Sequence, residues 1–284
     1  MNQLVKKTFA IIFVAFSFTQ LNGQTPKKLE LLFLGHNSKH HNSDVLASIM
    51  SKEYFKKGIN ITYTNNINDL NEKTLKPYDG LILYANYDTI SASHATALLN
   101  FVKNGKGFIP IHCASYCFRN NPEVVELIGG QFKEHGYDSF PSVFKDYNHP
   151  LIKNITPFYT KDETYTHTLL SKNITVLTER KDGNRKEPYT WIQNVGKGKV
   201  FYTAYGHDEN TFNNAQFLQL VENGILWAVN DNAIASLKAY TIATPTYTEA
   251  IIPNYEKRNP VPKYQGALTP AQSQSPGQLL PAWP

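Results

Sequence analysis

The sequence has little cysteine, and this limits its covalent chemistry. Two of its 284 residues are cysteine. Cys113 and Cys117 lie four residues apart, just after a predicted strand, and such close spacing on a helical turn rarely gives disulfide geometry without strain. We therefore expect two free or buried thiols.

Basic residues are scattered along the chain, and none forms a run longer than a pair such as Lys27 and Lys28. The formal net charge is only +5. Domains that bind nucleic acid concentrate their basic residues on one face or along one helix. No nucleic-acid partner is expected.

A long apolar run is also missing. The apolar stretch from Phe9 to Phe18 covers about ten residues, whereas a membrane-spanning helix needs roughly twenty. Lys6 and Lys7 precede it and the polar TQLNG follows, so residues 1–23 match a secretory signal peptide. We expect cleavage after Gly23 and a secreted or periplasmic protein. An uncleaved anchor is the alternative.

The remaining chain alternates short apolar runs with amphipathic segments. Strands are predicted at 29–34, 60–63, 78–84 and 107–111, with helices between them at about 44–57, 69–75 and 91–102. This alternation indicates a doubly wound, mostly parallel sheet flanked by helices, an α/β fold. Further strands are expected near 142–145, 164–167, 175–179, 189–193 and 198–203, and a helix at 215–229.

Domain limits follow from a change in composition. One domain is expected over residues 24–232. Residues 233–284 are predicted to be an extended linker or tail, because the segment from about 243 is rich in Pro, Thr, Ser and Gln without periodicity.

The stretch GKGFIPIHCAS, residues 105–115, places an imidazole and a thiol where a buried strand ends. Ligand and catalytic groups of open α/β sheets lie at the carboxyl ends of the strands. His112 follows one such strand, and His36, His41 and His207 follow the first and last strands. We expect these loops to converge, with His135 nearby.

Asp162 and Glu163 form an acidic pair in the segment KDETYTH. In a continuous strand, alternation would place Glu163, Tyr165 and His167 on one face. A carboxylate beside imidazoles can orient them, accept a proton or complete a metal site. The alternative is a solvated strand start.

Histidines mixed with carboxylates suit zinc or another divalent metal. No HExxH or comparably tight motif is present, so no cofactor is certain, and a divalent metal such as zinc stays an open alternative. Cys113 could be a nucleophile, but a buried structural thiol is the favoured interpretation.

Several segments together resemble the ThuA-like family, named for trehalose utilisation. They occur in the family's order over Leu29 to Val229. The segments are GHNSKHHNSD, GKGFIPIHCAS, IGGQFKEHG, NHP, DETYTH, GKGKVFYTAYGHD and the final helix ending in GILWAV. The family's fold is similar to the class I glutamine amidotransferases, a flavodoxin-like three-layer architecture.

The resemblance implies a role in sugar metabolism, with trehalose-type disaccharides and their 3-keto derivatives as substrates. In the related amidotransferases the strand delivers a nucleophilic cysteine, whereas the aligned residue here is His112, one place before Cys113. Glutamine hydrolysis is therefore not expected. Family members are often joined to haem-binding or dehydrogenase-like domains, and the tail NPVPKYQGALTPAQSQ is similar to the linker that leads into them. A truncated product of a longer gene stays open.

The functional prediction is an exported enzyme acting on a disaccharide or keto-glycoside by acid–base chemistry. The alternative is a non-catalytic sugar-binding module serving a redox partner domain. The predicted catalytic residues are His112, Glu163 and His207. The predicted substrate-binding residues are His36, His41, His135, Tyr165 and Trp191, the last two as stacking surfaces. The oligomeric state is not predicted.

Overall fold

The computed structural model describes residues 25–38 and 40–243. The predicted signal peptide and the part of the predicted tail beyond residue 243 lie outside these residues. The helices are α1 (Ser43–Phe55), α2 (Glu72–Leu75), α3 (Ala92–Lys103), α4 (Pro122–Ile128), α5 (Glu209–Phe212), α6 (Ala215–Ala228) and α7 (Asp231–Ala243), with short 3₁₀ helices at Ile67–Asp69 and His112–Tyr116. The strands are β1 (Leu29–Leu34), β2 (Asn37–Ser38), β3 (His41–Asn42), β4 (Ile59–Thr64), β5 (Gly80–Leu83), β6 (Gly107–Pro110), β7 (Gln131–Glu134), β8 (Tyr137–Pro141), β9 (Val143–Phe144), β10 (Tyr159–Glu163), β11 (Thr166–Thr168), β12 (Thr175–Asp182), β13 (Arg185–Val195) and β14 (Gly198–Thr203).

The core of the molecule is an eight-stranded sheet with the order β4-β1-β5-β6-β14-β13-β12-β9. The first five strands in this order pair in parallel, and the last three continue the sheet in antiparallel pairs. The chain adds β4 on one side of β1 and β5 on the other, which is the reversal of a doubly wound sheet. The predicted α/β fold class is confirmed.

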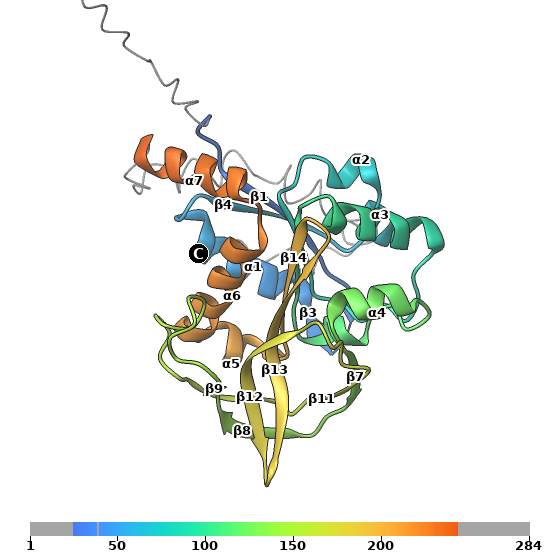
Figure 1. Cartoon of the computed structure of the whole chain (residues 1–284), viewed down its shortest axis with the longest axis vertical. Coiled ribbons are helices and arrows are strands. Elements are labelled where there is room, and N and C mark those ends of the chain that lie inside the picture. Colours follow the sequence, from blue (N-terminus) through green and yellow to red (C-terminus); the bar gives the residue numbers. More distant parts are fainter. Residues whose placement is uncertain (1–24, 39, 244–284) are drawn as a thin grey trace, which may run out of the picture.

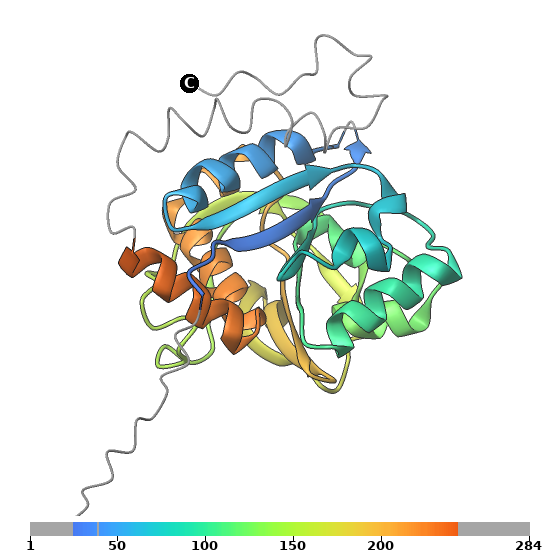
Figure 2. The same cartoon turned by 90° about the horizontal axis from the view of Figure 1, so that it is seen from above.

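Helices cover both faces of the parallel part of the sheet (Figures 1 and 2). On one face α1 lies beside α6, and the Tyr54 hydroxyl of α1 donates a hydrogen bond to the Leu218 carbonyl of α6 at 2.7 Å. On the other face lie α2, α3 and α4. Because both faces are covered, β5 and β6 are buried along their whole length, which explains their continuous apolar runs.

Local signals fix the ends of several helices. The Ser91 side chain accepts a hydrogen bond from the backbone N–H of His94 at the start of α3, which is the usual role of an N-cap serine. In α4, Pro122 occupies the first turn and Gly129 ends the helix in a left-handed conformation with φ of 96°.

The predicted tail is wrong at its start. Residues 231–243 form α7, not an extended segment. Leu237 of α7 is buried, and the backbone N–H of Lys27 donates to the Ser236 carbonyl at 3.2 Å. Ala and Leu favour helix here, and the helix packs beside the start of β1. The shift in composition that defines the tail comes after this helix.

Three two-stranded sheets accompany the central one in the described part of the chain. They pair β8 with β10, β7 with β11, and β2 with β3. Strand β10 ends at Glu163, which it brings to the carboxyl end of β6. Within residues 25–38 and 40–243, no helix has both the length and the apolar character needed to cross a membrane.

Candidate metal centre

The residue after β6 is held in an unusual backbone conformation. His112 has a φ of 49°, in the left-handed region that residues other than glycine seldom adopt. Such strain concentrates at functional positions. At this turn the His112 ring is directed toward Glu163, while the next residue, Cys113, enters the core with an exposed fraction of 1%.

The His112 ring is fixed by a bond to the backbone. Its Nδ1 lies 2.7 Å from the carbonyl oxygen of Ala204. A carbonyl only accepts, so Nδ1 carries the proton, and in the neutral ring Nε2 holds a lone pair. Nε2 lies 3.2 Å from Oε2 of Glu163. Two acceptors therefore face each other, unless a proton or a cation lies between them.

Two more histidines complete the cluster. In the described part of the chain, His41, His112, Glu163 and His207 each offer a ligand atom, and these four atoms all lie within 4.8 Å of one another. Both ring nitrogens of His41 are buried without a hydrogen-bond partner. Nδ1 of His207 lies 3.3 Å from Oε1 of Glu163, but without hydrogen-bond geometry. Unpaired buried polar atoms of this kind are costly and call for an explanation.

Burial and the one carboxylate, Glu163, determine the direction in which the pKa of each cluster residue shifts. Burial, together with the neighbouring His112 and His207, lowers the pKa of His41 to about 3, which keeps its ring neutral. Burial alone would raise the pKa of Glu163, but the neighbouring imidazoles of His112 and His207 outweigh it and lower that pKa. The pKa of His207 is raised: burial opposes the charge, and Glu163 more than compensates.

A second carboxylate holds the His207 loop from behind. Buried Asp162 accepts hydrogen bonds from the backbone N–H groups of Gly206 at 2.8 Å and His207 at 3.1 Å, and from the Thr211 hydroxyl at 2.7 Å. The Tyr84 hydroxyl lies 2.7 Å from the Gly206 carbonyl oxygen. Gly206 has a φ of 119°, and a Cβ there would come within 2.9 Å of Phe212. The loop geometry thus requires glycine.

The chemistry of these donors fits a divalent cation. Three imidazoles and one carboxylate are a ligand set that suits zinc and related metals. Ligand atoms about 2.1 Å from an ion lie at most about 4.2 Å apart, so small side-chain rotations would close this cluster around one. The unpartnered nitrogens of His41 and the facing acceptors of His112 and Glu163 are what such an ion would satisfy.

The structure places the remaining predicted residues around or away from the cluster. His135 borders it, with Nδ1 at 3.6 Å from Oε1 of Glu163. Tyr165 is buried and stacks on His112 with ring centroids 4.2 Å apart, so it supports that ring and presents no open face. His36 lies outside the ligand set: its Nδ1 is 2.6 Å from Asn86 Oδ1 and its ring contacts Tyr87.

The prediction of Trp191 as a sugar-stacking surface is wrong. Its side chain is completely buried, its indole N–H donates to the Ile128 carbonyl at 2.8 Å, and its ring stacks on Tyr202. The strand that carries it, β13, has partners on both sides. An inward-facing residue of such a strand is a core residue.

The expected alignment of Glu163, Tyr165 and His167 on one strand is also incorrect. The segment breaks into β10 and β11. His167 contacts Glu187 and the Tyr202 hydroxyl, each at 3.1 Å, and lies outside the ligand set. Sequence reasoning also missed Tyr84 and the role of Asp162, because their contacts are with the backbone of a distant loop.

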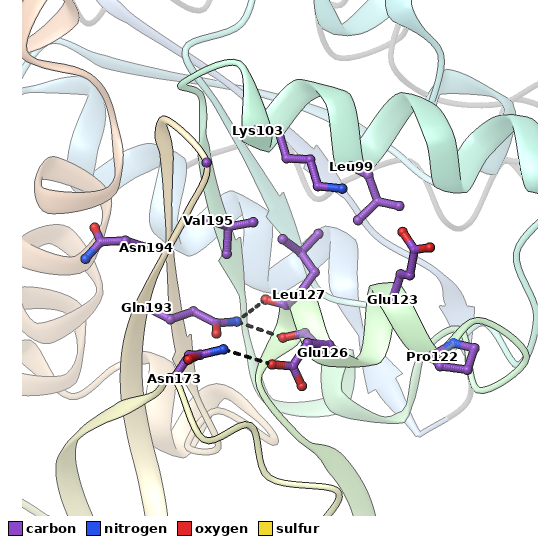
Figure 3. Close-up of a pocket in the computed structure, with 11 residues that line it drawn as sticks. Leu99, Lys103, Pro122, Glu123, Glu126, Leu127, Asn173, Gln193, Asn194 and Val195 are labelled. Carbon is purple, nitrogen blue, oxygen red and sulfur yellow. Dashed lines mark hydrogen bonds between the residues drawn. The ribbon is translucent and has the colours of Figure 1, made fainter.

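A separate cavity of about 520 Å³ lies between α3, α4 and β13 (Figure 3). Gln193 closes its floor by donating to the carbonyls of Glu126 and Leu127. None of the four cluster residues lines it.

Comparison with known proteins supplies the family. The family model of ThuA, described as trehalose utilisation, matches residues 30–228, more than half of the chain. A ThuA-like protein from Parabacteroides merdae is 19% identical, with a TM-score of 0.63 over 71% of this chain and 90% of its own. A ThuA-like protein from Bacteroides uniformis is also 19% identical, with a TM-score of 0.61 over 72% of this chain and 92% of its own.

The comparison with curated proteins finds no match to the chain. The solved structures share the fold of this chain, a mostly parallel α/β sheet flanked by helices. The family match is consistent with a role in carbohydrate metabolism. By the extent of that match, the chain belongs to the ThuA family, whose description is trehalose utilisation.

Proposed function

We propose that this protein is an exported enzyme that acts on the keto form of a trehalose-type disaccharide, with a divalent cation such as zinc at the His41–His112–Glu163–His207 cluster. Membership of the trehalose-utilisation family supports the substrate class. The cluster supports the chemistry, because it lies at the carboxyl end of a parallel sheet, where α/β proteins bind their ligands.

One observation carries the proposal: the lone pair of His112 Nε2 faces the carboxylate of Glu163 at 3.2 Å. The bond from Nδ1 to Ala204 prevents the neutral ring from turning a proton toward Glu163. A neighbouring imidazole, His41, is held neutral by burial and has no protein partner. Such an arrangement is stable when a cation occupies the space between these atoms.

The side chains divide the work. A bound divalent cation supplies a Lewis acid that polarises a sugar carbonyl. His41 and His112 offer it lone pairs, and Glu163 offsets its charge. Because its pKa is lowered, Glu163 is ionised at neutral pH and accepts the proton from the carbon next to the carbonyl. His207 would offer a further lone pair to the cation, and protonated Glu163 would return its proton to the oxygen on which negative charge develops.

Two parts of the proposal, export and a redox partner, do not depend on the described residues. Export rests on the signal-peptide pattern of residues 1–23. A haem-binding or dehydrogenase-like partner fits the chemistry, because a keto sugar must be supplied by oxidation of a hydroxyl group.

The test uses protein purified without chelators. Elemental analysis should find about one divalent metal per chain, and the protein should convert a 3-keto disaccharide in a panel that includes 3-keto trehalose. His112→Ala should abolish this turnover. His94→Ala, a half-buried histidine at the start of α3 and outside the cluster, is the control. Binding of sugar without turnover, at any metal loading, would favour the non-catalytic sugar-binding module instead.

A further inference from the structure

A second cavity, of about 450 Å³, lies directly beside the cluster. His135 and Tyr137 form the border between the two. His135 lines the cavity, and its Nδ1 is 3.6 Å from Glu163. Tyr137 also lines it, and its ring meets the edge of His207 with centroids 6.0 Å apart. The volume falls within the range of about 300–1,000 Å³ that is usual for small-molecule sites.

The lining of this cavity is almost entirely polar. It includes three acidic residues and two arginines, besides His135, Tyr137 and two threonines. The charged residues are Glu134, Asp138, Asp182, Arg180 and Arg185. An anionic ligand would meet the three carboxylates, and a cationic ligand would meet the two guanidinium groups. A neutral ligand with many hydroxyls can use both sets, because each hydroxyl donates and accepts.

One wall contains a buried arginine. The Arg180 side chain is only 6% exposed, and its Nη2 lies 3.4 Å from the carbonyl oxygens of Thr164 and Tyr165. Its Nε has no hydrogen-bond partner. The guanidinium also lies 3.8 Å from Asp182 and 5.8 Å from the ring centroids of Phe140 and Tyr189, so these contacts fix its position in the wall.

An aromatic surface completes the cavity. Tyr137 is 48% exposed, and its hydroxyl lies 3.4 Å from Asp208, which restrains the ring without covering it. Aromatic faces bind the apolar side of sugar rings, and an exposed tyrosine offers this area at low entropic cost. Tyr137 thus occupies the role that the sequence suggested for Trp191.

We propose that this cavity is the subsite for the second, non-reacting sugar ring of a disaccharide whose first ring lies at the cluster. The inference rests on the proposed function for the identity of the first ring. The ligand chain would run from the cluster past His135, with the second ring against Tyr137 and its hydroxyls on Arg180 and Arg185. The site is therefore built for a neutral disaccharide rather than a free monosaccharide.

Calorimetric titration of the full-length, metal-analysed protein tests the subsite. The probes are trehalose, cellobiose and lactose, each compared with glucose. At least one disaccharide should bind ten-fold or more tightly than glucose. Tyr137→Ala and Arg185→Ala should each weaken that disaccharide at least five-fold and leave glucose affinity unchanged. Arg185 and Tyr137 are both largely exposed, so these variants should keep the wild-type fold and melting temperature.

Matched controls come from the same residue types elsewhere. Tyr147→Ala removes a tyrosine that is 58% exposed on another loop, and Arg119→Ala removes an arginine that stacks on Tyr116. Neither should change the affinity of any probe. Equal affinity of disaccharide and glucose, or no effect of Tyr137→Ala and Arg185→Ala, overturns the subsite.

The outcome is separable from that of the proposed function. Bound metal and turnover of a keto disaccharide, with unchanged affinity in both cavity variants, would retain the enzyme and reject the subsite. Selective disaccharide binding that is lost in the variants, in protein without metal or turnover, would retain the subsite and reject the enzyme.

Discussion

Asp162 and Glu163 are adjacent in sequence, yet their carboxylates serve opposite purposes. Asp162 is completely buried and binds backbone N–H groups of the loop that carries His207. Glu163 faces the ring nitrogens of His112 and His207. One carboxylate positions the cluster and the other takes part in it. This division separates the expected effects of two single substitutions.

Asp162→Asn should destabilise the protein and disturb the His207 loop. The amide would present an N–H group toward backbone N–H donors and leave at least one of them unpaired, at a cost of about 1–3 kcal/mol. Urea denaturation should show this loss of unfolding free energy, and metal affinity should fall with it. Asp138→Asn, at an exposed position, is the control. Unchanged stability and metal affinity would contradict the assigned role.

Glu163→Gln should weaken metal binding strongly and affect the stability of the metal-free protein only slightly. The cluster loses its only negative charge, so divalent metal should bind at least about ten-fold more weakly, which is the lower range for altered metal sites. The unfolding free energy of the metal-free protein should change less than in Asp162→Asn. Titration with zinc and cobalt measures the affinity. Glu134→Gln, an exposed acid in β7, should bind metal like the wild type.

The metal-free protein should lose stability as the pH falls below about 6.5. Burial lowers the pKa of His167 despite the neighbouring Glu187. Below the unfolded pKa of about 6.5, the unfolded chain takes up a proton that the folded His167 resists, with a slope of up to about 1.4 kcal/mol per pH unit. This contribution is present above pH 6.5 and is lost toward the folded pKa.

His167→Gln tests this dependence. Unfolding free energies measured by denaturation at pH 7.5, 6.5 and 5.5 should fall less steeply in the variant than in the wild type. His149→Gln, in the turn between Asp146 and Ile152, should leave the slope unchanged, because this half-buried histidine has no acidic partner in the described part of the chain. Parallel curves for wild type and His167→Gln would show that His167 does not carry the effect.

Cys113 should be chemically inert in the native protein. It is buried, and burial raises its thiol pKa well above the usual value, so little thiolate forms. Cys117 is likewise free and buried. Native protein should therefore resist iodoacetamide, whereas protein in urea should react at both thiols. Cys113→Ala should keep turnover of a keto disaccharide within about two-fold. Rapid alkylation with loss of turnover would restore the nucleophile hypothesis.

The sequence predicts the sheet well because each parallel strand appears as a continuous apolar run. Both faces of β1, β5 and β6 are covered, and a continuous apolar run ending at Gly35 or His112 is the direct result. The convergence of loops could likewise be inferred, since parallel strands open at one edge. These signals are local in sequence, and the parallel topology then places the loops at the same edge of the sheet.

The remaining features depend on contacts that no local pattern records. Trp191 has the residue type of a sugar-binding surface, but the end of α4 and the ring of Tyr202 cover it. Tyr137 and Arg180 belong to no sequence motif. Their cavity forms only in the folded protein, where β8 of a small sheet lies near β12 of the central sheet. The helical start of the predicted tail was missed because α7 is amphipathic only weakly and depends on packing against the first strand.

The four cluster residues lie in segments far apart in the chain, from His41 near the start of the domain to His207 near its end. A cation held by all of them would act as a cross-link between the first and last thirds of the fold. The cation would bind the folded state and not the unfolded chain, in which the same side chains are far apart. Its binding free energy would therefore add to the free energy of unfolding. The ion would then set the thermal tolerance of the domain as well as its reactivity.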